Sequence, residues 1–344
     1  MRIYFHTFGC KVNQYETQLL REQICYNGNY QPVEKIETAD IAIINSCTVT
    51  HNADADTRQL VRRIIRVNPR CRIIVTGCYA VRSKKEILDI SNSVEICPIK
   101  EKIPCYLGLN YENRQTITYF ADHSRAFVKI QDGCDAFCSY CIVPYVRPKL
   151  WSKPLETILK EVDSLVENGY KEIVLCGIRL GKYSSNNAKN FAELVKNLMN
   201  IRDDFRISFS SLEVQEITEE LIEVLASTDR IVHHFHIPLQ SADNEVLKRM
   251  SRPYTSEEFQ YKIDCIRKKL KDVIFTTDVI VGFPGETEKN FLNTYNFIEK
   301  NKFKKIHVFR FSPRPGTKAE NFKDYVDSKE IKKRAVALLK FSKC

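Results

Sequence analysis

Strand-like and helix-like patterns alternate along almost the whole chain, and this alternation restricts the fold more than any other feature. In the first part, strand-rich runs at residues 2–7, 41–46 and 72–76 are each followed by a helical pattern. Alternation of this kind is typical of a parallel sheet with helices on its faces. We therefore expect an N-terminal α/β domain over residues 1–110. Its first helix should begin near Asn13, where Glu16 offers the reciprocal half of a capping box.

A second series of strand and helix patterns follows a connection at residues 98–124, in which we expect short strands. Six candidate strands lie at residues 127–131, 172–176, 206–211, 234–240, 274–281 and 305–312. Helical patterns separate most of them, and the clearest one, at residues 155–166, is followed by a stop at Gly169. Six such units make an incomplete (β/α)8 barrel. We expect residues 120–344 to form this (β/α)6 barrel, with its active site at the carboxyl ends of the strands.

Three cysteines share one structural position, since Cys10, Cys47 and Cys78 each stand at the end of a predicted strand of the N-terminal domain. In an open parallel sheet the carboxyl ends lie along one edge, where ligands bind. The three thiols can therefore converge although they are far apart in the sequence. Burial as small apolar side chains is the alternative. Because it gives no reason for three strand-end positions, we expect a shared metal cluster.

A second cysteine group lies in the loop after the first barrel strand, where Cys134, Cys138 and Cys141 have the spacing Cys-x3-Cys-x2-Cys. Three thiolates this close together can bind three irons of a [4Fe–4S] cube and leave the fourth iron open. A structural zinc site needs four closed ligands, and no fourth Cys or His lies nearby in the sequence. Non-catalytic electron carriers normally close all four iron positions, so the spacing favours a catalytic cluster.

Length, cysteine count and net charge indicate the number of domains, the cellular setting and the kind of partner. The 344 residues exceed the size at which one core stops growing, which favours two domains. The 13 Cys are an odd number, so at least one thiol stays unpaired, and no apolar run approaches the ~18 residues of a membrane span. These features predict a reducing, cytoplasmic setting with no membrane partner. The net charge of +10 favours an anionic partner such as RNA.

Longer motifs extend the pattern beyond the cysteines. They are Phe8-Gly9-Cys10-Lys11-Val12-Asn13-Gln14-Tyr15-Glu16, Asn45-Ser46-Cys47-Thr48-Val49-Thr50, Thr76-Gly77-Cys78-Tyr79-Ala80, Cys138-Ser139-Tyr140-Cys141-Ile142-Val143-Pro144-Tyr145, His236-Ile237-Pro238-Leu239-Gln240-Ser241 and Val281-Gly282-Phe283-Pro284-Gly285-Glu286. Together they cover nearly the whole chain and resemble the radical S-adenosylmethionine (SAM) methylthiotransferase family. The Gly9-Cys10-Lys11 string is most similar to the branch that methylthiolates C2 of N6-threonylcarbamoyladenosine, next to the anticodon of tRNA.

The resemblance implies cofactors and partners. Cys134, Cys138 and Cys141 would hold the [4Fe–4S] cluster that cleaves SAM, and the strand-end cysteines would hold an auxiliary [4Fe–4S] cluster that presents sulfur. The substrate would be tRNA, with a reductant such as flavodoxin or ferredoxin and a sulfur donor as further partners. Relatives typically continue with a small RNA-binding β-barrel domain, which we expect to be absent from this chain because it stops at Cys344.

Several weaker candidates lie near predicted strand ends. As SAM or substrate contacts we consider Tyr140, Glu213, Gln240, Arg252, Asp278, Gly282 and Gly285. The alternatives are ordinary packing for Tyr140, structural hydrogen bonds for the polar side chains and a plain tight turn for the two glycines. We expect no metal role for His233, His234 and His236, because alternation along a strand places only the last two on one face.

Three other functions stay open at this stage. The chain could act in another branch of the family, on isopentenyladenosine or on a ribosomal protein. It could be a non-catalytic iron–sulfur electron carrier. It could also be a truncated relative that binds clusters but cannot hold tRNA.

Overall fold

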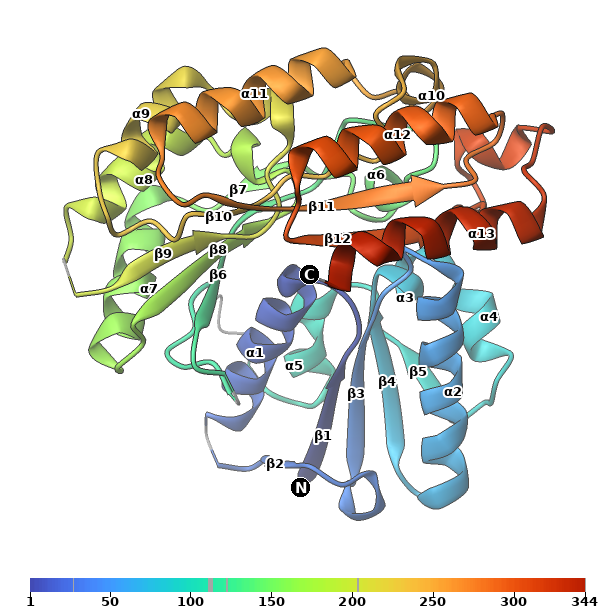
Figure 1. Cartoon of the computed structure of the whole chain (residues 1–344). Coiled ribbons are helices and arrows are strands. Elements are labelled where there is room, and N and C mark those ends of the chain that lie inside the picture. Colours follow the sequence, from blue (N-terminus) through green and yellow to red (C-terminus); the bar gives the residue numbers. More distant parts are fainter. Residues whose placement is uncertain (27, 111–113, 122, 203, 344) are drawn as a thin grey trace.

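The computed structural model describes residues 1–26, 28–110, 114–121, 123–202 and 204–343. Its N-terminal part is a parallel sheet of five strands in the order β2-β1-β3-β4-β5 (Figure 1). The strands are β1 (Arg2–Thr7), β2 (Gln31–Val33), β3 (Ile41–Ser46), β4 (Arg72–Gly77) and β5 (Val94–Ile96). The inner strands β3 and β4 are rich in isoleucine and valine and are buried on both faces, as expected of a parallel sheet between helices.

Helices cover both faces of this sheet (Figure 1). One face packs against α1 (Lys11–Cys25) and α5 (Ile103–Tyr106), and the other against α2 (His51–Val67). The short helices α3 (Cys78–Arg82) and α4 (Lys84–Leu88) connect β4 to β5. Two apolar clusters result, one on each face, so the predicted three-layer α/β arrangement is confirmed.

Six parallel strands form the second part of the molecule and confirm the predicted incomplete barrel. They are β6 (Ala126–Asp132), β8 (Glu172–Gly177), β9 (Arg206–Phe209), β10 (His234–His236), β11 (Ile274–Val281) and β12 (Lys305–Arg310). A bridge between Ser211 and His236 joins the sheet of β6, β8 and β9 to that of β10, β11 and β12. A two-residue strand, β7 (Trp151–Ser152), runs antiparallel beside β6.

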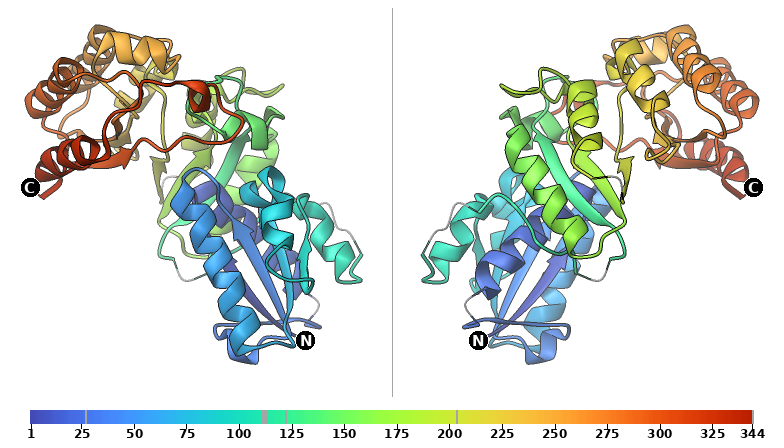
Figure 2. Two further views of the ribbon diagram at one scale, coloured as in Figure 1. Left: turned by 90° about the vertical axis from the view of Figure 1, so that its right-hand side faces the viewer. Right: turned by 90° about the vertical axis from the view of Figure 1, so that its left-hand side faces the viewer.

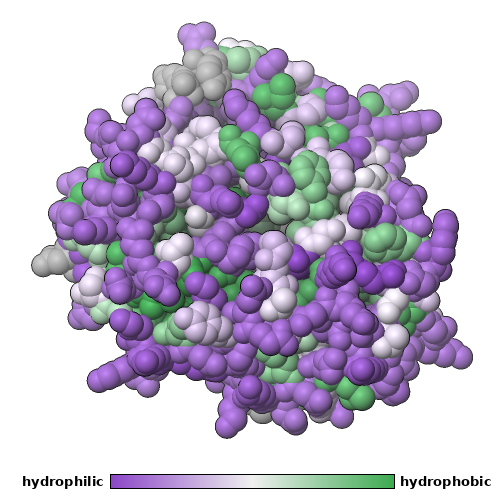
Figure 3. Space-filling view, turned by 90° about the horizontal axis from the view of Figure 1, so that it is seen from above, coloured by the Kyte–Doolittle hydropathy of each residue, from purple (hydrophilic) through white to green (hydrophobic). Residues whose placement is uncertain are grey.

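The outer face of the barrel carries helices that follow the strands. They are α7 (Leu155–Glu167), α8 (Phe191–Met199), α9 (Glu219–Ala226), α10 (Asn244–Arg249), α11 (Ser256–Lys269), α12 (Glu288–Asn301) and α13 (Ser328–Leu339). The short helix α6 (Val143–Val146) lies instead against α3 of the N-terminal domain. Seen from above, the surface is mostly hydrophilic with scattered apolar side chains (Figure 3). Within the described residues, no helix has the length and apolar character needed to cross a membrane.

Helix α1 packs against both the N-terminal sheet and the barrel. Val12 and Tyr15 join the core of the barrel, while Leu20 and Ile24, further along the same helix, pack on the N-terminal sheet. The N-terminal sheet consequently lies directly below the barrel strands, and the rest of the barrel extends to one side of it (Figure 2). This arrangement brings the carboxyl ends of β1, β3 and β4 towards the barrel.

Three sequence expectations were wrong in detail. Helix α1 begins at Lys11 after Cys10, and Asn13 does not cap it, because Asn13 lies inside the helix and its side-chain oxygen accepts from Arg147. The described part of the 98–124 connection holds a 3-10 turn (Lys100–Lys102) and α5, with no strand. The N-terminal sheet has two additional strands, β2 and β5, which are only three residues long and show no clear alternation.

Candidate functional site: two cysteine groups at one cavity

The first cysteine group assembles at the carboxyl edge of the N-terminal sheet. Cys10 follows β1, Cys47 follows β3 and Cys78 begins α3 directly after β4. Because β1, β3 and β4 are neighbours in the sheet, these three ends lie side by side. Burial, with smaller contributions from the thiols of Cys78 and Cys10, raises the pKa of the Cys47 thiol to about 11. Three thiols thus stand at neighbouring strand ends on one edge of the sheet.

Two glycines allow this close approach. Gly9 has a φ of +98°, and a Cβ placed on it would lie 2.8 Å from the Cys47 sulfur. Gly77 has a φ of +91°, and a Cβ there would press against the backbone of Ser46. Any other residue at these positions would be strained and would push the strand ends apart.

The second group is held by the loop between β6 and α6. Cys134 and Cys138 are buried, and Cys141 is half-buried. Burial, with smaller contributions from the thiols of Cys138 and Cys134, raises the pKa of Cys141 to about 12. Three sulfur atoms thus gather at the carboxyl end of the first barrel strand, where barrel enzymes place their active sites.

Backbone hydrogen bonds hold this loop from several sides. Ser139 donates its N–H to the Met250 carbonyl oxygen at 2.9 Å, and its own carbonyl oxygen accepts from the Ala319 N–H at 2.7 Å. The Cys134 N–H donates to the Arg147 carbonyl oxygen at 3.1 Å. Because the anchoring segments follow different strands of the barrel, the loop is held in position before any ligand binds.

A cavity of 610 Å³ connects the two groups. Its lining includes the cysteines Cys10, Cys134, Cys138, Cys141 and Cys176 and, of the weaker sequence candidates, Tyr140, Glu213, Gln240, Arg252 and Asp278. Cys47 and Cys78 do not line the cavity. The volume is in the range of pockets that bind small molecules.

Arg252 connects the barrel loop to a carboxylate on the cavity wall. Its guanidinium forms an ion pair with Glu213 and donates through Nη1 to the Cys138 sulfur at 3.4 Å. The guanidinium also stacks over the Tyr254 ring, 4.9 Å from its centroid. This set of contacts holds a fixed positive charge beside the cysteine loop, which partly offsets the effect of burial on the pKa of Cys141.

The remaining weaker candidates are placed differently. Tyr140 faces the cavity and packs edge-on against Phe283, with 6.4 Å between ring centroids. Gln240 faces the cavity with a φ of +62°, a backbone conformation uncommon for this residue type. Gly282 and Gly285 do not line the cavity, and both have positive φ in the turn after β11. Packing against Ile331 and Asp324 leaves no room for a Cβ, so the tight turn accounts for both glycines.

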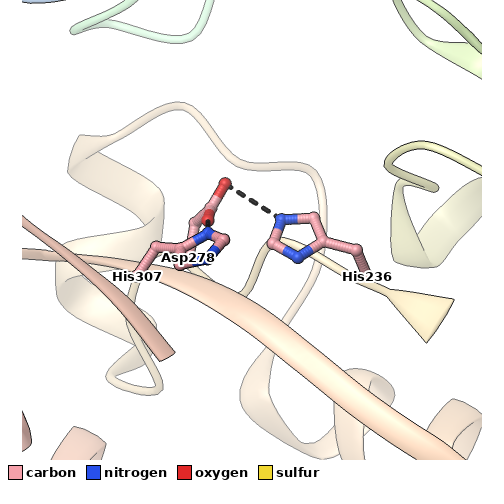
Figure 4. A group of neighbouring side chains, drawn as sticks. All are labelled: His236, Asp278 and His307. Carbon is pink, nitrogen blue, oxygen red and sulfur yellow. Dashed lines mark hydrogen bonds and ion pairs between the residues drawn. The ribbon is translucent and has the colours of Figure 1, made fainter. Parts of the chain in front are cut away.

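Asp278 sits between two imidazoles on adjacent strands (Figure 4). The Nε2 atom of His236 on β10 lies 3.2 Å from one carboxylate oxygen, and the Nδ1 atom of His307 on β12 lies 3.1 Å from the other. His307 was not a sequence candidate. Register explains the contact, because Asp278 pairs with His307 across β11 and β12.

Sequence reasoning also missed the role of Arg147. Its guanidinium donates to Glu16, Asp132 and Asn13 at 2.8–2.9 Å and through Nε to the Cys78 sulfur at 3.4 Å. Arg314 similarly reaches Thr48 and Asp54 of the N-terminal domain from the loop after β12. No local pattern could reveal these contacts, since the partners lie far apart in the sequence.

Both cysteine groups suit iron–sulfur clusters. Each offers three soft thiol ligands from a rigid edge or loop, the donor type that such clusters prefer. Each also has an arginine that donates a hydrogen bond to one sulfur, Arg147 to Cys78 and Arg252 to Cys138. Hydrogen bonds of this kind to ligand sulfur are a usual feature of cluster sites.

Comparison with known proteins agrees with this geometry. Residues 128–298 match the radical SAM superfamily, and residues 2–97 match a family described as uncharacterized protein family UPF0004. The radical SAM methyltransferase TsrM from Kitasatospora setae has a similar fold, with a TM-score of 0.66 over 92% of this chain and 76% of that one at 12% identity.

Curated relatives are more similar in sequence. The threonylcarbamoyladenosine tRNA methylthiotransferase MtaB of Bacillus subtilis is 43% identical over 98% of this chain and 79% of its own length. That of Thermotoga maritima is 36% identical over 95% of this chain and 79% of its own. A tRNA-2-methylthio-N(6)-dimethylallyladenosine synthase from Thermodesulfovibrio yellowstonii is 31% identical over 98% and 82%.

The barrel, its open three-cysteine loop and the adjoining cavity define a radical SAM enzyme. The N-terminal domain and the similarity to the curated relatives then identify one family within this superfamily. The chain belongs to the radical SAM methylthiotransferase family, a family of transferases that use SAM and [4Fe–4S] clusters.

Proposed function

We propose that the protein inserts a methylthio group at C2 of N6-threonylcarbamoyladenosine, next to the anticodon of tRNA. The observation that carries this proposal is the single cavity between two separate cysteine groups. Sequence identity supports the choice of base, because relatives named for threonylcarbamoyladenosine are 43% and 36% identical and the dimethylallyladenosine relative is 31% identical.

The two cysteine groups have different roles in this proposal. Cys134, Cys138 and Cys141 hold the cluster that binds SAM, and Cys10, Cys47 and Cys78 hold the auxiliary cluster. When bound, the two clusters supply the electron for SAM cleavage and the sulfur for transfer. Residues 1–110 act as the sulfur-presenting domain and residues 120–344 as the SAM-cleaving domain.

The polypeptide provides positioning, charge and enclosure. Arg252 fixes a positive charge beside Cys138, and Tyr140, Glu213 and Gln240 line the wall where SAM binds. Radical chemistry at an aromatic C–H bond must be shielded from water and side reactions. The enclosure requires both domains, because Lys11 and Val12 of α1 and Arg314 beyond β12 line the same cavity.

Further partners follow from the chemistry. An electron must come from a low-potential reductant such as flavodoxin or ferredoxin, and the transferred sulfur must be replaced by a sulfur donor. The excess of basic residues, with a net charge of +10, supports binding of tRNA phosphates. A tRNA substrate implies work in the cytoplasm.

Nucleoside analysis of tRNA tests this function. We expect total tRNA from cells lacking the gene to lose 2-methylthio-N6-threonylcarbamoyladenosine and to regain it when the gene is restored. A variant in which Cys134, Cys138 and Cys141 are replaced by alanine should not restore it. Loss of the methylthio group from isopentenyladenosine alone would contradict the choice of base while leaving the family assignment intact.

A further inference from the structure

A polar group beside the cavity is not used by the cluster chemistry. It consists of His236, Asp278 and His307, whose side chains point towards one another from three adjacent strands (Figure 4). Asp278 also lines the 610 Å³ cavity, so the group adjoins the space in which the substrate must bind.

Hydrogen bonds determine which ring nitrogens carry protons. A carboxylate only accepts, so His236 donates to Asp278 through Nε2 and His307 donates through Nδ1. The Nδ1 atom of His236 lies 3.0 Å from the Thr276 hydroxyl, from which it accepts. A neutral His307 ring then keeps a free acceptor at Nε2, and its side chain is 44% exposed. The strands therefore hold one oriented acceptor beside Asp278, which lines the cavity.

A cation without a partner faces the same cavity from the opposite domain. Three lining arginines have carboxylate partners: Arg179 pairs with Glu216, Arg252 with Glu213 and Arg314 with Asp54. Lys11, which follows Cys10, has no carboxylate within ion-pair distance in the described part of the chain, and neither has Arg310 at the exposed rim.

The substituent of the proposed base has matching chemistry. A threonylcarbamoyl group carries a carboxylate, a hydroxyl and urea N–H donors, whereas a dimethylallyl group is an uncharged hydrocarbon. A half-buried cation without a counterion and a fixed acceptor without a donor both raise the free energy of the protein. A ligand that supplies an anion and a donor therefore binds favourably. Lys11 in the cavity lining and His307 beside Asp278 supply such a cation and such an acceptor, which suits the first substituent and not the second.

We propose that Lys11 binds the carboxylate of the threonylcarbamoyl group and that His307 accepts a hydrogen bond from its N–H or hydroxyl donors. Asp278 and His236 are positioning residues, because they act only by orienting His307. This inference rests on the proposed function and adds the residues that select the base. The same three residues also resemble a two-histidine, one-carboxylate metal site, which the experiment must distinguish.

Two RNAs that differ only in the charge of the carboxyl group separate recognition of that charge from general affinity for RNA. The probe is an anticodon stem–loop RNA with N6-threonylcarbamoyladenosine or its methyl ester, titrated anaerobically into the cluster-loaded enzyme. We expect the wild-type enzyme to bind the acid about tenfold or more tightly than the ester. The Lys11→Met variant should bind both RNAs as weakly as the wild-type enzyme binds the ester. The iron content of each preparation, measured alongside, shows whether the clusters are retained.

Two further variants complete the test. Lys84→Met removes the same charge from an exposed site of the N-terminal domain and should change acid and ester binding equally. His307→Phe should weaken both RNAs alike, since the ester keeps the N–H and hydroxyl donors.

The contradicting outcomes are distinct. Equal weakening of acid and ester by Lys11→Met would overturn the assignment of Lys11. Stoichiometric binding of added Mn²⁺, lost in His307→Phe and required for RNA binding, would replace the subsite with a metal site. Methylthiolation of dimethylallyladenosine and not of the threonylcarbamoyl base by the wild-type enzyme would overturn the proposed function itself, before any variant is compared.

Discussion

Arg147 donates a hydrogen bond through Nε to the Cys78 sulfur at 3.4 Å, across the boundary between the two domains. The carbonyl oxygen of the same arginine accepts the Cys134 N–H at 3.1 Å. One residue of the barrel therefore contacts both cysteine groups, one through its side chain and the other through its backbone. The relative placement of the two groups depends on this residue and on the acids that hold it, Glu16 and Asp132.

The first prediction concerns Arg147 itself. Arg147→Met should leave Glu16 and Asp132 partly unpaired in a buried setting and lower the free energy of unfolding by about 3–5 kcal/mol. Arg2→Met, which removes an exposed ion pair with Asp40, should cost at most about 1 kcal/mol. Anaerobic urea unfolding measures both. Similar losses in the two variants would show that the Arg147 contacts do not stabilise the domain interface.

A second prediction concerns pH. Burial alone would raise the pKa of Glu16, but Arg147, Lys100 and Lys129 outweigh it and hold this pKa well below the usual 4.5. Because the folded pKa is lower than the unfolded one, the stabilisation is present above about pH 4.5 and is lost as the pH falls towards the folded value. Glu16→Gln should therefore lose stability less steeply than the wild type as the pH falls below about 4.5. If the free energy of unfolding in urea falls equally with pH in the variant and the wild type, Glu16 does not have this role.

The third prediction tests the second polar contact between the domains. Tyr15 donates to Glu161 at 2.6 Å and accepts from Lys153 at 2.8 Å in a fully buried group. Tyr15→Phe should leave these partners partly unsatisfied and cost about 1–3 kcal/mol. Tyr26→Phe near the end of α1 removes an exposed hydroxyl and should be close to neutral, since Tyr26 is 73% exposed. Equal thermal midpoints for the two variants would argue against a structural role for the buried group.

A fourth prediction uses the glycine before the cysteine loop. Gly133 has a φ of +83°, and a Cβ there would collide with the Lys149 carbonyl oxygen. Gly133→Ala should displace the loop and lower the iron content at Cys134, Cys138 and Cys141. Gly169→Ala has a comparable φ of +95° with open space around it, so it should cost only about 1–2 kcal/mol and keep the iron. Normal iron content in Gly133→Ala would show that the loop tolerates the shift.

The sequence was sufficient for the architecture and for the cysteine positions, and the reason is local. The six barrel strands have apolar runs long enough to recognise, and Cys10, Cys47 and Cys78 follow visible strand ends. The contacts of Arg147 and the pairing of Asp278 with His307 depend instead on strand register and domain packing, which no short pattern encodes. Asn13 shows the same limit, because a tertiary contact with Arg147 replaced the cap that its local sequence predicted.

Iron counting combined with SAM cleavage tests the central claim most directly, namely that the two cysteine groups hold two independent clusters at one cavity. Anaerobically reconstituted wild-type protein should contain about eight irons per chain. Replacing Cys134, Cys138 and Cys141 by alanine should halve the iron and abolish SAM cleavage. Replacing Cys10, Cys47 and Cys78 should also halve the iron but leave SAM cleavage measurable. Complete loss of iron and of cleavage in both triple variants would contradict independent clusters.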